Sequence, residues 1–529
     1  MKFRSWSGPE STNGSAWPSR TFKLRGARRR CGFFRLLLEP GYTCWRHETA
    51  GRFALLPENA TYFEALAAAL PLARKSILIL GWQFDPRTRL HPEGRDHHQV
   101  EIGHLLRRLV RERPELKVRL LIWRQPLPIA WTQDFYPQRA FRWFSNERLA
   151  IDFRLDRARP FGACHHQKVV VIDDRLAFCG GGDISVDRWD TAEHIDHNPL
   201  RCTPTGLIRQ PRHEVMTLMD GEAARAFADL ARQRWLEGTG ETLEPVELDV
   251  EAPVWPEGVP IDARDVKVGI ARTEPAWRGQ AGVRESEFLH LECIAKAKRL
   301  IYLENQYFTS PLVAAALALR LEEKDGPEVV VISTARAPSW FDHLAMDGAR
   351  QALLQRLRRA DLYGRLSAWT PVTAGGNTII VHSKVTCIDD RLLRVGSTNL
   401  NNRSAGFDTE CDVAIEADWE GDDVSLLVQR TRCNLIGHFL GVDGETFREA
   451  HAEMGKVGAA IRKLNTQGRL RQIGTKPASA FAKAFSEWQL GDPASPGDSW
   501  RPWRRRRLSR AFKQTVAYAA EAEREDAAG

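Results

Sequence analysis

One short pattern occurs twice in this chain of 529 residues, and the two copies are in register. His166-Gln167-Lys168 is followed by Asp173 and Gly180, and His382-Ser383-Lys384 is followed by Asp389 and Gly396. The differences 382 − 166, 384 − 168, 389 − 173 and 396 − 180 are all 216. A single His-x-Lys carries little information, but two copies in register indicate an internal duplication with two half-sites.

Each copy reads as a strand, a turn and a second short apolar run that ends at glycine. The first copy continues K-V-V-V-I-D-D-R and the second K-V-T-C-I-D-D-R. His and Lys separated by one residue point to the same face of a strand. This arrangement suits a nitrogen nucleophile beside a cation that holds an anionic substrate. The alternative is a duplicated hairpin without chemistry, which we do not favour because a buried lysine is costly unless it is paired.

Composition favours a globular α/β protein with an anionic partner. Apolar residues make up 43% of the chain, and strand and helix patterns alternate along it. The net charge of +8 favours phospholipid headgroups or nucleic acid without choosing between them. The length suggests two to four domains, of which the duplication favours two.

The repeat divides the chain into five parts. A helix at 61–74 and a strand at 76–82 have counterparts at 285–298 and 300–305. Further paired strands are expected at 117–123 and 328–334, and each half closes with a strand and a helix. We predict a basic leader at 1–54, a first half at 55–245, a linker at 246–264, a second half at 265–445 and a basic extension at 446–529.

The remaining features concern the compartment. Nine scattered cysteines without a C-x-x-C pair read as free thiols. No apolar run approaches the length of a spanning helix, and no standard secretory signal is recognisable. We therefore expect a cytoplasmic protein with peripheral membrane contact. Export without a standard signal is the alternative.

The repeated motif resembles the signature of the phospholipase D superfamily, in which an aspartate follows the lysine by five positions and a glycine-led segment begins after a further six residues. The second copy matches through Ser397 and Asn399, whereas the first reads Gly180-Gly181-Gly182-Asp183, a form common in eukaryotic-type members. The resemblance covers about 55–445. It implies a tandem duplication of an α/β/α sandwich, with two pseudo-twofold related halves and one shared active site.

The same resemblance suggests roles for the histidines and lysines. His166 is expected to be the nucleophile that forms a phosphohistidine, and His382 the acid and then the base, although these roles could be exchanged. The phosphoryl oxygens would be held by Lys168, Lys384, Ser397 and Asn399.

Carboxylates complete the predicted site. A catalytic histidine needs an acceptor on its other nitrogen, and Glu410 resembles the family's carboxylate for this role. Counting back 216 positions gives His194, so Asp196 is nominated on the first side. Asp183 has no settled role, and Asp173 and Asp389 are expected to tie down their turns.

No metal or cofactor is expected, because lysine supplies the positive charge and no carboxylates stand at metal-ligand spacing. A zinc site made of His194, His197 and His213 is the alternative. We favour satisfied or surface histidines over it.

The resulting hypothesis is a phosphodiesterase that hydrolyses glycerophospholipid headgroups, for example phosphatidylcholine to phosphatidic acid and choline. Its partners would be a phospholipid membrane surface and water or an alcohol as acceptor, and a monomer is expected because both half-sites are in one chain. Transphosphatidylation, including cardiolipin synthesis, is the first alternative and a nuclease the second; we do not favour nucleic acid as a partner. A non-catalytic binder is the least favoured.

Overall fold

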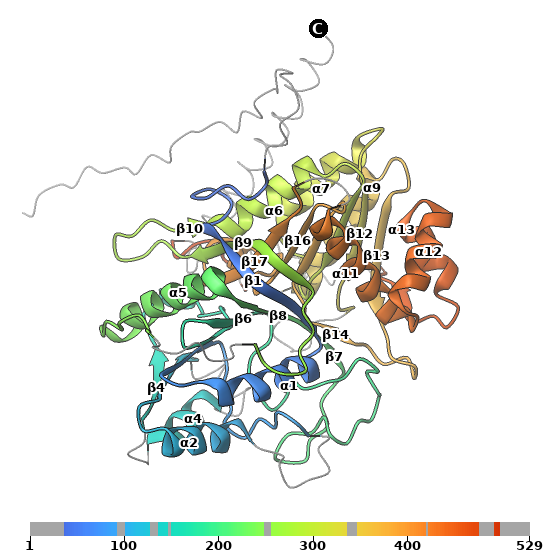
Figure 1. The fold of residues 1–529 in the computed structure, drawn as a ribbon. Helices are drawn as coiled ribbons and strands as arrows, with labels where there is room; N and C mark the ends of the chain where they lie inside the picture. The colour runs from blue at the N-terminus through green and yellow to red at the C-terminus, as the bar shows by residue number, and fades with distance from the viewer. Residues whose placement is uncertain are drawn as a thin grey trace, which may run out of the picture. The chain divides into compact units, whose positions relative to one another are not determined.

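A single mixed β-sheet runs through both copies of the repeated motif (Figure 1). The computed structural model describes residues 36–92, 101–126, 136–145, 150–247, 255–335, 346–418, 422–474 and 491–497. The strands of the first half are β1 (Arg46–Pro57), β2 (Ser76–Gly81), β3 (Lys117–Trp123), β4 (Ile151–Asp156), β5 (Val169–Ile172), β6 (Leu176–Gly180) and β8 (Val215–Asp220). Those of the second half are β9 (Ala263–Glu274), β11 (Leu300–Glu304), β12 (Glu328–Ile332), β13 (Leu366–Pro371), β15 (Val385–Ile388), β16 (Leu392–Gly396) and β17 (Glu410–Glu416).

The two halves have the same strand order. It runs β1-β8-β6-β5-β2-β3-β4 in the first half and β9-β17-β16-β15-β11-β12-β13 in the second. The two series meet where β1 pairs antiparallel with β9, with Ala50 opposite Val266. Matching strand orders that meet at an antiparallel pair are what a pseudo-twofold relation between the halves requires. A short strand, β18 (Leu470–Gln472), extends the second half beyond β13.

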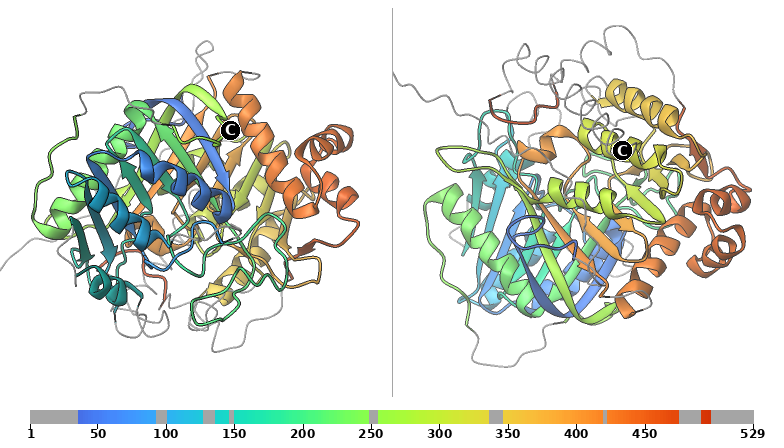
Figure 2. Two further views of the ribbon diagram at one scale, coloured as in Figure 1. Left: turned by 60° about the horizontal axis from the view of Figure 1, so that its bottom comes forward. Right: turned by 90° about the horizontal axis from the view of Figure 1, so that it is seen from above.

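The helices also correspond between the halves and cover both faces of the sheet (Figure 2). Side chains alternate along β2, so that Ile77 and Ile79 pack with the helices of one face and Leu78 and Leu80 with those of the other. The predicted α/β fold class is therefore confirmed. One face carries α1 (Asn59–Ala69), α2 (Ile102–Glu112), α4 (Tyr136–Ser145), α6 (Glu285–Lys296), α7 (Pro311–Glu322) and α9 (Gly348–Ala360), and the other α5 (Gly221–Thr239) and α11 (Asp423–Leu440).

Two elements of the structure run across predicted boundaries. Residues 46–54, assigned to the basic leader, belong to β1, where charged side chains near the seam obscure the apolar alternation. The extension was predicted to begin at 446, but this position lies inside α12 (Gly444–Met454), which is followed by α13 (Val457–Leu464). Both helices pack on the same core as α11. The division of the chain into separate domains stays a prediction.

Two predictions about the whole chain can be compared with the described residues. The eight cysteines among them are unpaired, as expected for free thiols. None of the described helices has both the length and the apolar character that a bilayer span requires. The Trp- and Arg-rich run at 500–507 lies outside the described residues.

Candidate active site

Each copy of the motif lies against a segment of the opposite half. The backbone N–H of His166 donates to the carbonyl of Thr409 at 3.0 Å. In the other copy, β14 (Ile380–Val381) pairs with β7 (Arg212–His213), and the N–H of His382 donates to the carbonyl of His213 at 2.8 Å. Thr409 and His213 immediately precede Glu410 and Glu214 in the chain. The two half-sites therefore form one site across the seam.

The side chains of the two histidines also bond to residues of the opposite half. Nδ1 of His166 lies 2.8 Å from Oε2 of Glu410, and Nδ1 of His382 pairs with Oε2 of Glu214. Both carboxylates are fully buried. Because a carboxylate holds Nδ1 in each ring, Nε2 is the nitrogen left to react with substrate.

The nomination of Asp196 is thereby corrected in favour of Glu214. Asp196 bonds to the loop around Thr373, with the N–H of Gly375 at 2.9 Å and the amide of Asn377 at 2.6 Å. Counting by a fixed offset failed because Glu214 lies 34 positions after Gly180, whereas Glu410 lies only 14 positions after Gly396. Glu214 could have been found from its place beside the last strand of its half. It directly precedes β8, as Glu410 begins β17 in the second half.

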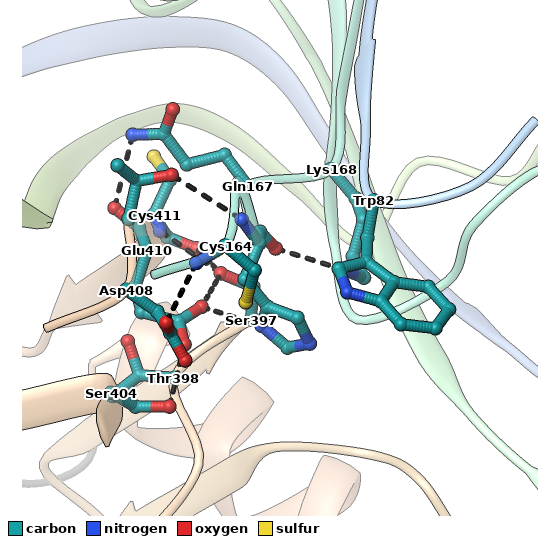
Figure 3. Close-up of polar contacts among 12 residues, drawn as sticks. Trp82, Cys164, Gln167, Lys168, Ser397, Thr398, Ser404, Asp408, Glu410 and Cys411 are labelled. Atoms are coloured by element: carbon teal, nitrogen blue, oxygen red, sulfur yellow. Dashed lines mark hydrogen bonds and ion pairs between the residues drawn. The ribbon is translucent and has the colours of Figure 1, made fainter. Parts of the chain in front are cut away.

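Ser397 contacts Glu410, and its predicted contact with phosphate stays a prediction. Its hydroxyl donates to Oε2 of Glu410 at 2.5 Å, and the hydroxyl of Ser404 donates to Oε1 at 2.5 Å (Figure 3). Ser397 Oγ in turn accepts from the N–H of Cys411 at 3.0 Å. Two hydroxyls and a histidine thus fix the orientation of the buried carboxylate.

The two lysines occupy equivalent places but different electrostatic surroundings. The ammonium of Lys168 donates to the carbonyl of His166 at 2.9 Å and lies 3.3 Å from a carboxylate oxygen of Asp183. That of Lys384 donates to the carbonyl of His382. The equivalent of Asp183 in the second half, 216 positions later, is Asn399, which carries no charge.

The pKa of Lys384 is lowered by its surroundings. Burial lowers the pKa of Lys384 to about 7, with Lys168 acting in the same direction against the opposing charge of Glu214. An anionic phosphate would offset that cost. Asn399 is buried, and its Oδ1 has no hydrogen-bond partner among the described residues. Only its amide N–H group, as a donor, could bond to a phosphate oxygen.

The surroundings keep both histidines neutral. Burial, with Lys168 and Lys384, holds the pKa of His166 well below its usual range. Burial also lowers the pKa of His382, together with Lys384, Arg212 and Arg188. A neutral imidazole carries the lone pair that a nucleophile needs.

Sequence reasoning missed one cation of this site. Arg212 is buried, and its Nε and Nη1 have no partner among the described residues. Burial and the neighbouring Arg188 lower the pKa of Arg212 to about 10, so its guanidinium stays charged at neutral pH. Its charge and its unpaired nitrogens suit an anionic ligand.

The other motif residues hold the backbone. Asp173 accepts from the N–H groups of Lys75 and Ser76, each at 2.7 Å. Asp389 accepts from those of Arg299 at 2.7 Å and Leu300 at 2.9 Å. Each aspartate thereby ties its turn to the start of the neighbouring strand. A side chain at Gly180 would collide with Met216, and one at Gly396 with Asp412.

Comparisons with known proteins agree with this geometry. The family model described as "Cardiolipin synthase, PLD-like domain" matches residues 290–429. Phospholipase D1 of Saccharomyces cerevisiae is 22% identical over 450 residues, which cover 68% of this chain and 26% of the relative. Phospholipase D A of Dictyostelium discoideum is 23% identical over 455 residues, covering 72% of this chain and 35% of the relative. The chain spans about a quarter to a third of these relatives.

Among solved structures, phosphatidylserine synthase of Haemophilus influenzae has 14% identity and a TM-score of 0.47, over 88% of this chain and 93% of that one. The matched sequences and the two crossed histidine sites agree with the phospholipase D superfamily. Residues 290–429 match its PLD-like domain, and the curated relatives named above are phospholipases D.

Proposed function

We propose that the protein is a phosphodiesterase that removes the headgroup of glycerophospholipids, such as choline from phosphatidylcholine, through a phosphohistidine at His166. The observation that carries the proposal is the crossed pairing of the two histidines with Glu410 and Glu214. It presents two reactive nitrogens to one space lined by Lys168 and Lys384.

The reaction divides into two steps. Nε2 of His166 attacks phosphorus, the bond to the headgroup oxygen breaks, and His382 gives that oxygen its proton. Water then attacks phosphorus while His382 takes the water proton, and the bond to His166 breaks to release phosphatidic acid. Lys168, Lys384 and the amide of Asn399 hold the non-bridging oxygens.

The acid role requires His382 to carry a proton that its surroundings disfavour. The positive charges of Lys384, Arg212 and Arg188 contribute to the low proton affinity of the free site. A bound phosphodiester offsets these charges and so raises the pKa of His382 when substrate arrives. Glu214 stabilises the resulting imidazolium.

A primary alcohol can replace water in the second step, which gives a phosphatidyl alcohol. Transphosphatidylation, including cardiolipin synthesis, is therefore the first alternative and uses the same residues. A nuclease is the second alternative, since the superfamily chemistry is that of a phosphodiester in general. The net charge of +8 suits peripheral contact with an anionic membrane surface as well as it suits nucleic acid. A monomer is sufficient, because one chain supplies both histidines.

The test is headgroup release from mixed phospholipid vesicles, with and without a primary alcohol. We would compare the native protein with His166→Asn, His382→Asn and the control His104→Asn, whose side chain is 63% exposed. The proposal predicts phosphatidic acid from the native chain and the control, a phosphatidyl alcohol when alcohol is added, and neither product from the two site variants. Intact vesicles together with cleavage of a nucleic acid would overturn it.

A further inference from the structure

A second cluster of histidines lies beside the active site and has no part in the chemistry described above. It consists of Glu58, His194, His213 and His438, whose ligand atoms all lie within 4.8 Å of one another. Glu58 precedes α1, His194 follows β6, His213 is in β7 and His438 is in the last turn of α11. Three of these residues come from the first half and one from the second.

We propose that these four residues bind a zinc(II) ion that ties α11 to the first half. Three imidazole nitrogens and one carboxylate oxygen form the donor set that tetrahedral zinc prefers, whereas calcium and magnesium require mostly oxygen ligands.

Three of the separations between ligand atoms are close to those around a tetrahedral ion. Nε2 of His194 is 3.0 Å from Nε2 of His438, and Oε1 of Glu58 is 3.3 Å from the latter and 3.6 Å from the former. Ligand atoms ~2.0–2.1 Å from a tetrahedral zinc lie about 3.3 Å apart. The fourth donor, Nδ1 of His213, pairs with Oε1 of Glu58.

The outer nitrogens of two histidines are already held as ligands of a metal would be. Nδ1 of His194 lies 2.9 Å from a carboxylate oxygen of Asp190, and Nε2 of His213 lies 3.0 Å from one of Glu304. A carboxylate on the outer nitrogen of a histidine fixes the ring and directs the other nitrogen toward a metal. In the cluster, these inner nitrogens are the ones that converge.

Charge balance calls for a cation. Glu58, Asp190 and Glu304 are buried, and among the described residues they form ion pairs with Arg201 and otherwise only with histidines. Oε2 of Glu58 is buried without a hydrogen-bond partner. Buried carboxylates in excess of their cations are costly, and a divalent ion corrects the excess.

Protonation of the histidines pairs the nitrogens of the cluster less well than a metal ion does. The facing Nε2 atoms of His194 and His438 cannot both carry hydrogen at 3.0 Å, since two N–H groups would then point at each other. A metal ion accepts a lone pair from each ring. Glu58 and His194 also adopt positive φ values of 66° and 46°, a backbone conformation that persists where the surroundings enforce it.

The position of the cluster suggests what the ion does. His213 is the residue before Glu214, and its carbonyl accepts the backbone N–H of His382. An ion bound to His213 therefore fixes the segment that orients His382. It does not supply charge to the phosphate, because it lies on side chains outside the two His-Lys pairs.

The test is the metal content of the full chain, purified without chelator, by mass spectrometry of the elements. We expect about one zinc per chain in the native protein and in the control His451→Gln, on the neighbouring helix α12, and loss of most of it in His438→Gln. The native protein depleted with a chelator should regain thermal stability on addition of zinc(II). A native protein that holds no zinc and whose melting temperature does not respond to zinc(II) would overturn the proposal.

A second variant guards against loss of metal through misfolding. His438→Cys keeps a zinc ligand at the same position, so it should retain zinc where His438→Gln does not. With cobalt(II) in place of zinc, the native protein should show the visible absorption of a tetrahedral site, and His438→Cys should add a thiolate-to-cobalt band. A cobalt spectrum unchanged between the native protein and His438→Cys would show that His438 is not a ligand.

Discussion

His166 in the first half is held by Glu410 in the second, with Nδ1 2.8 Å from Oε2. The reciprocal pair, His382 and Glu214, has the same crossed arrangement. Neither half alone contains both members of a histidine–carboxylate pair, because each carboxylate belongs to the other half. In the proposed mechanism, the seam between β1 and β9 is therefore required for the chemistry as well as for the fold.

Removal of either buried charge should lower turnover sharply. Glu410→Gln and Glu214→Gln keep the size of the side chain but lose the charge that selects the tautomer of the histidine, so we expect kcat to fall about 10²- to 10⁴-fold. Steady-state kinetics on mixed vesicles measures this. Asp196→Asn is the matched control and should retain kcat within a factor of about three, since Asp196 bonds only to a loop. Equal losses in all three variants would contradict the assignment.

Ser397 should matter through Glu410 alone. Ser397→Ala removes one of the two hydroxyl donors to that carboxylate, while Ser404 retains its bond at 2.5 Å. We expect a loss of about tenfold in kcat with little change in KM, because no bond to the phosphate is removed. A rise in KM with an unchanged kcat would show that the hydroxyl binds substrate after all.

The pH profile of kcat/KM should be displaced toward acidic pH. The nucleophile must be neutral, and since the pKa of His166 is lowered, kcat/KM should persist well below the ordinary histidine value of about 6.5. The phosphate-binding form of Lys384 is the charged one, and with its pKa of about 7, kcat/KM should decline as the pH rises above that value.

Lys384→Arg checks the alkaline limb. Arginine keeps its charge throughout the range, so the part of the decline above neutral pH that is added to proton loss from His382 should disappear, even if the maximum is lower. An alkaline limb that is identical in the native protein and in Lys384→Arg would show that another group causes it.

Arg212 should contribute to binding of the anionic phosphodiester. Arg212→Met removes a buried guanidinium whose Nε and Nη1 have no partner among the described residues, and we expect a loss of about 10- to 100-fold in kcat/KM. Arg157→Met, at an exposed position, is the control. An unchanged kcat/KM for Arg212→Met would exclude this guanidinium from the site.

The turn aspartates should affect stability more than chemistry. Asp389→Ala leaves the N–H groups of Arg299 and Leu300 without their acceptor, and the free energy of unfolding should fall by about 2 kcal/mol or more. Asp325→Ala, at an exposed turn, should change it by less than about 0.5 kcal/mol. Denaturant unfolding of both variants checks the difference. Equal stability of the two variants would contradict the role given to Asp389.

Within the repeated motif, the strands, the turn and the His-Lys pair share the constant spacing of 216, so their correspondence is visible without a structure. Apolar periodicity also predicted strands outside the motif, among them β2, β3, β11 and β12. Glu214 was missed because the connection before it is longer than its counterpart in the second half. β1 was missed because a strand at the centre of a sheet here carries charged residues, which a period-2 pattern does not anticipate.

The histidine cluster was beyond sequence reasoning for a related cause. His194 and His213 were considered together with His197, which the structure places at the surface. Their actual partners, Glu58 and His438, lie far away in the sequence and are brought close only by the packing of α11 near the end of β1.

The central claim is that one site, shared by both halves, forms a covalent intermediate on His166. The most direct measurement is mass spectrometry of peptides from His382→Asn, exposed to a phosphatidyl ester of p-nitrophenol and quenched in alkali. p-Nitrophenolate leaves without a proton, so loss of the acid His382 does not block the first step. Loss of the base blocks the second step, so the phosphatidyl group should remain on the peptide that contains His166. An adduct on the peptide of residue 382 in the reciprocal variant His166→Asn would exchange the two roles, and the absence of an adduct from both variants would contradict the account.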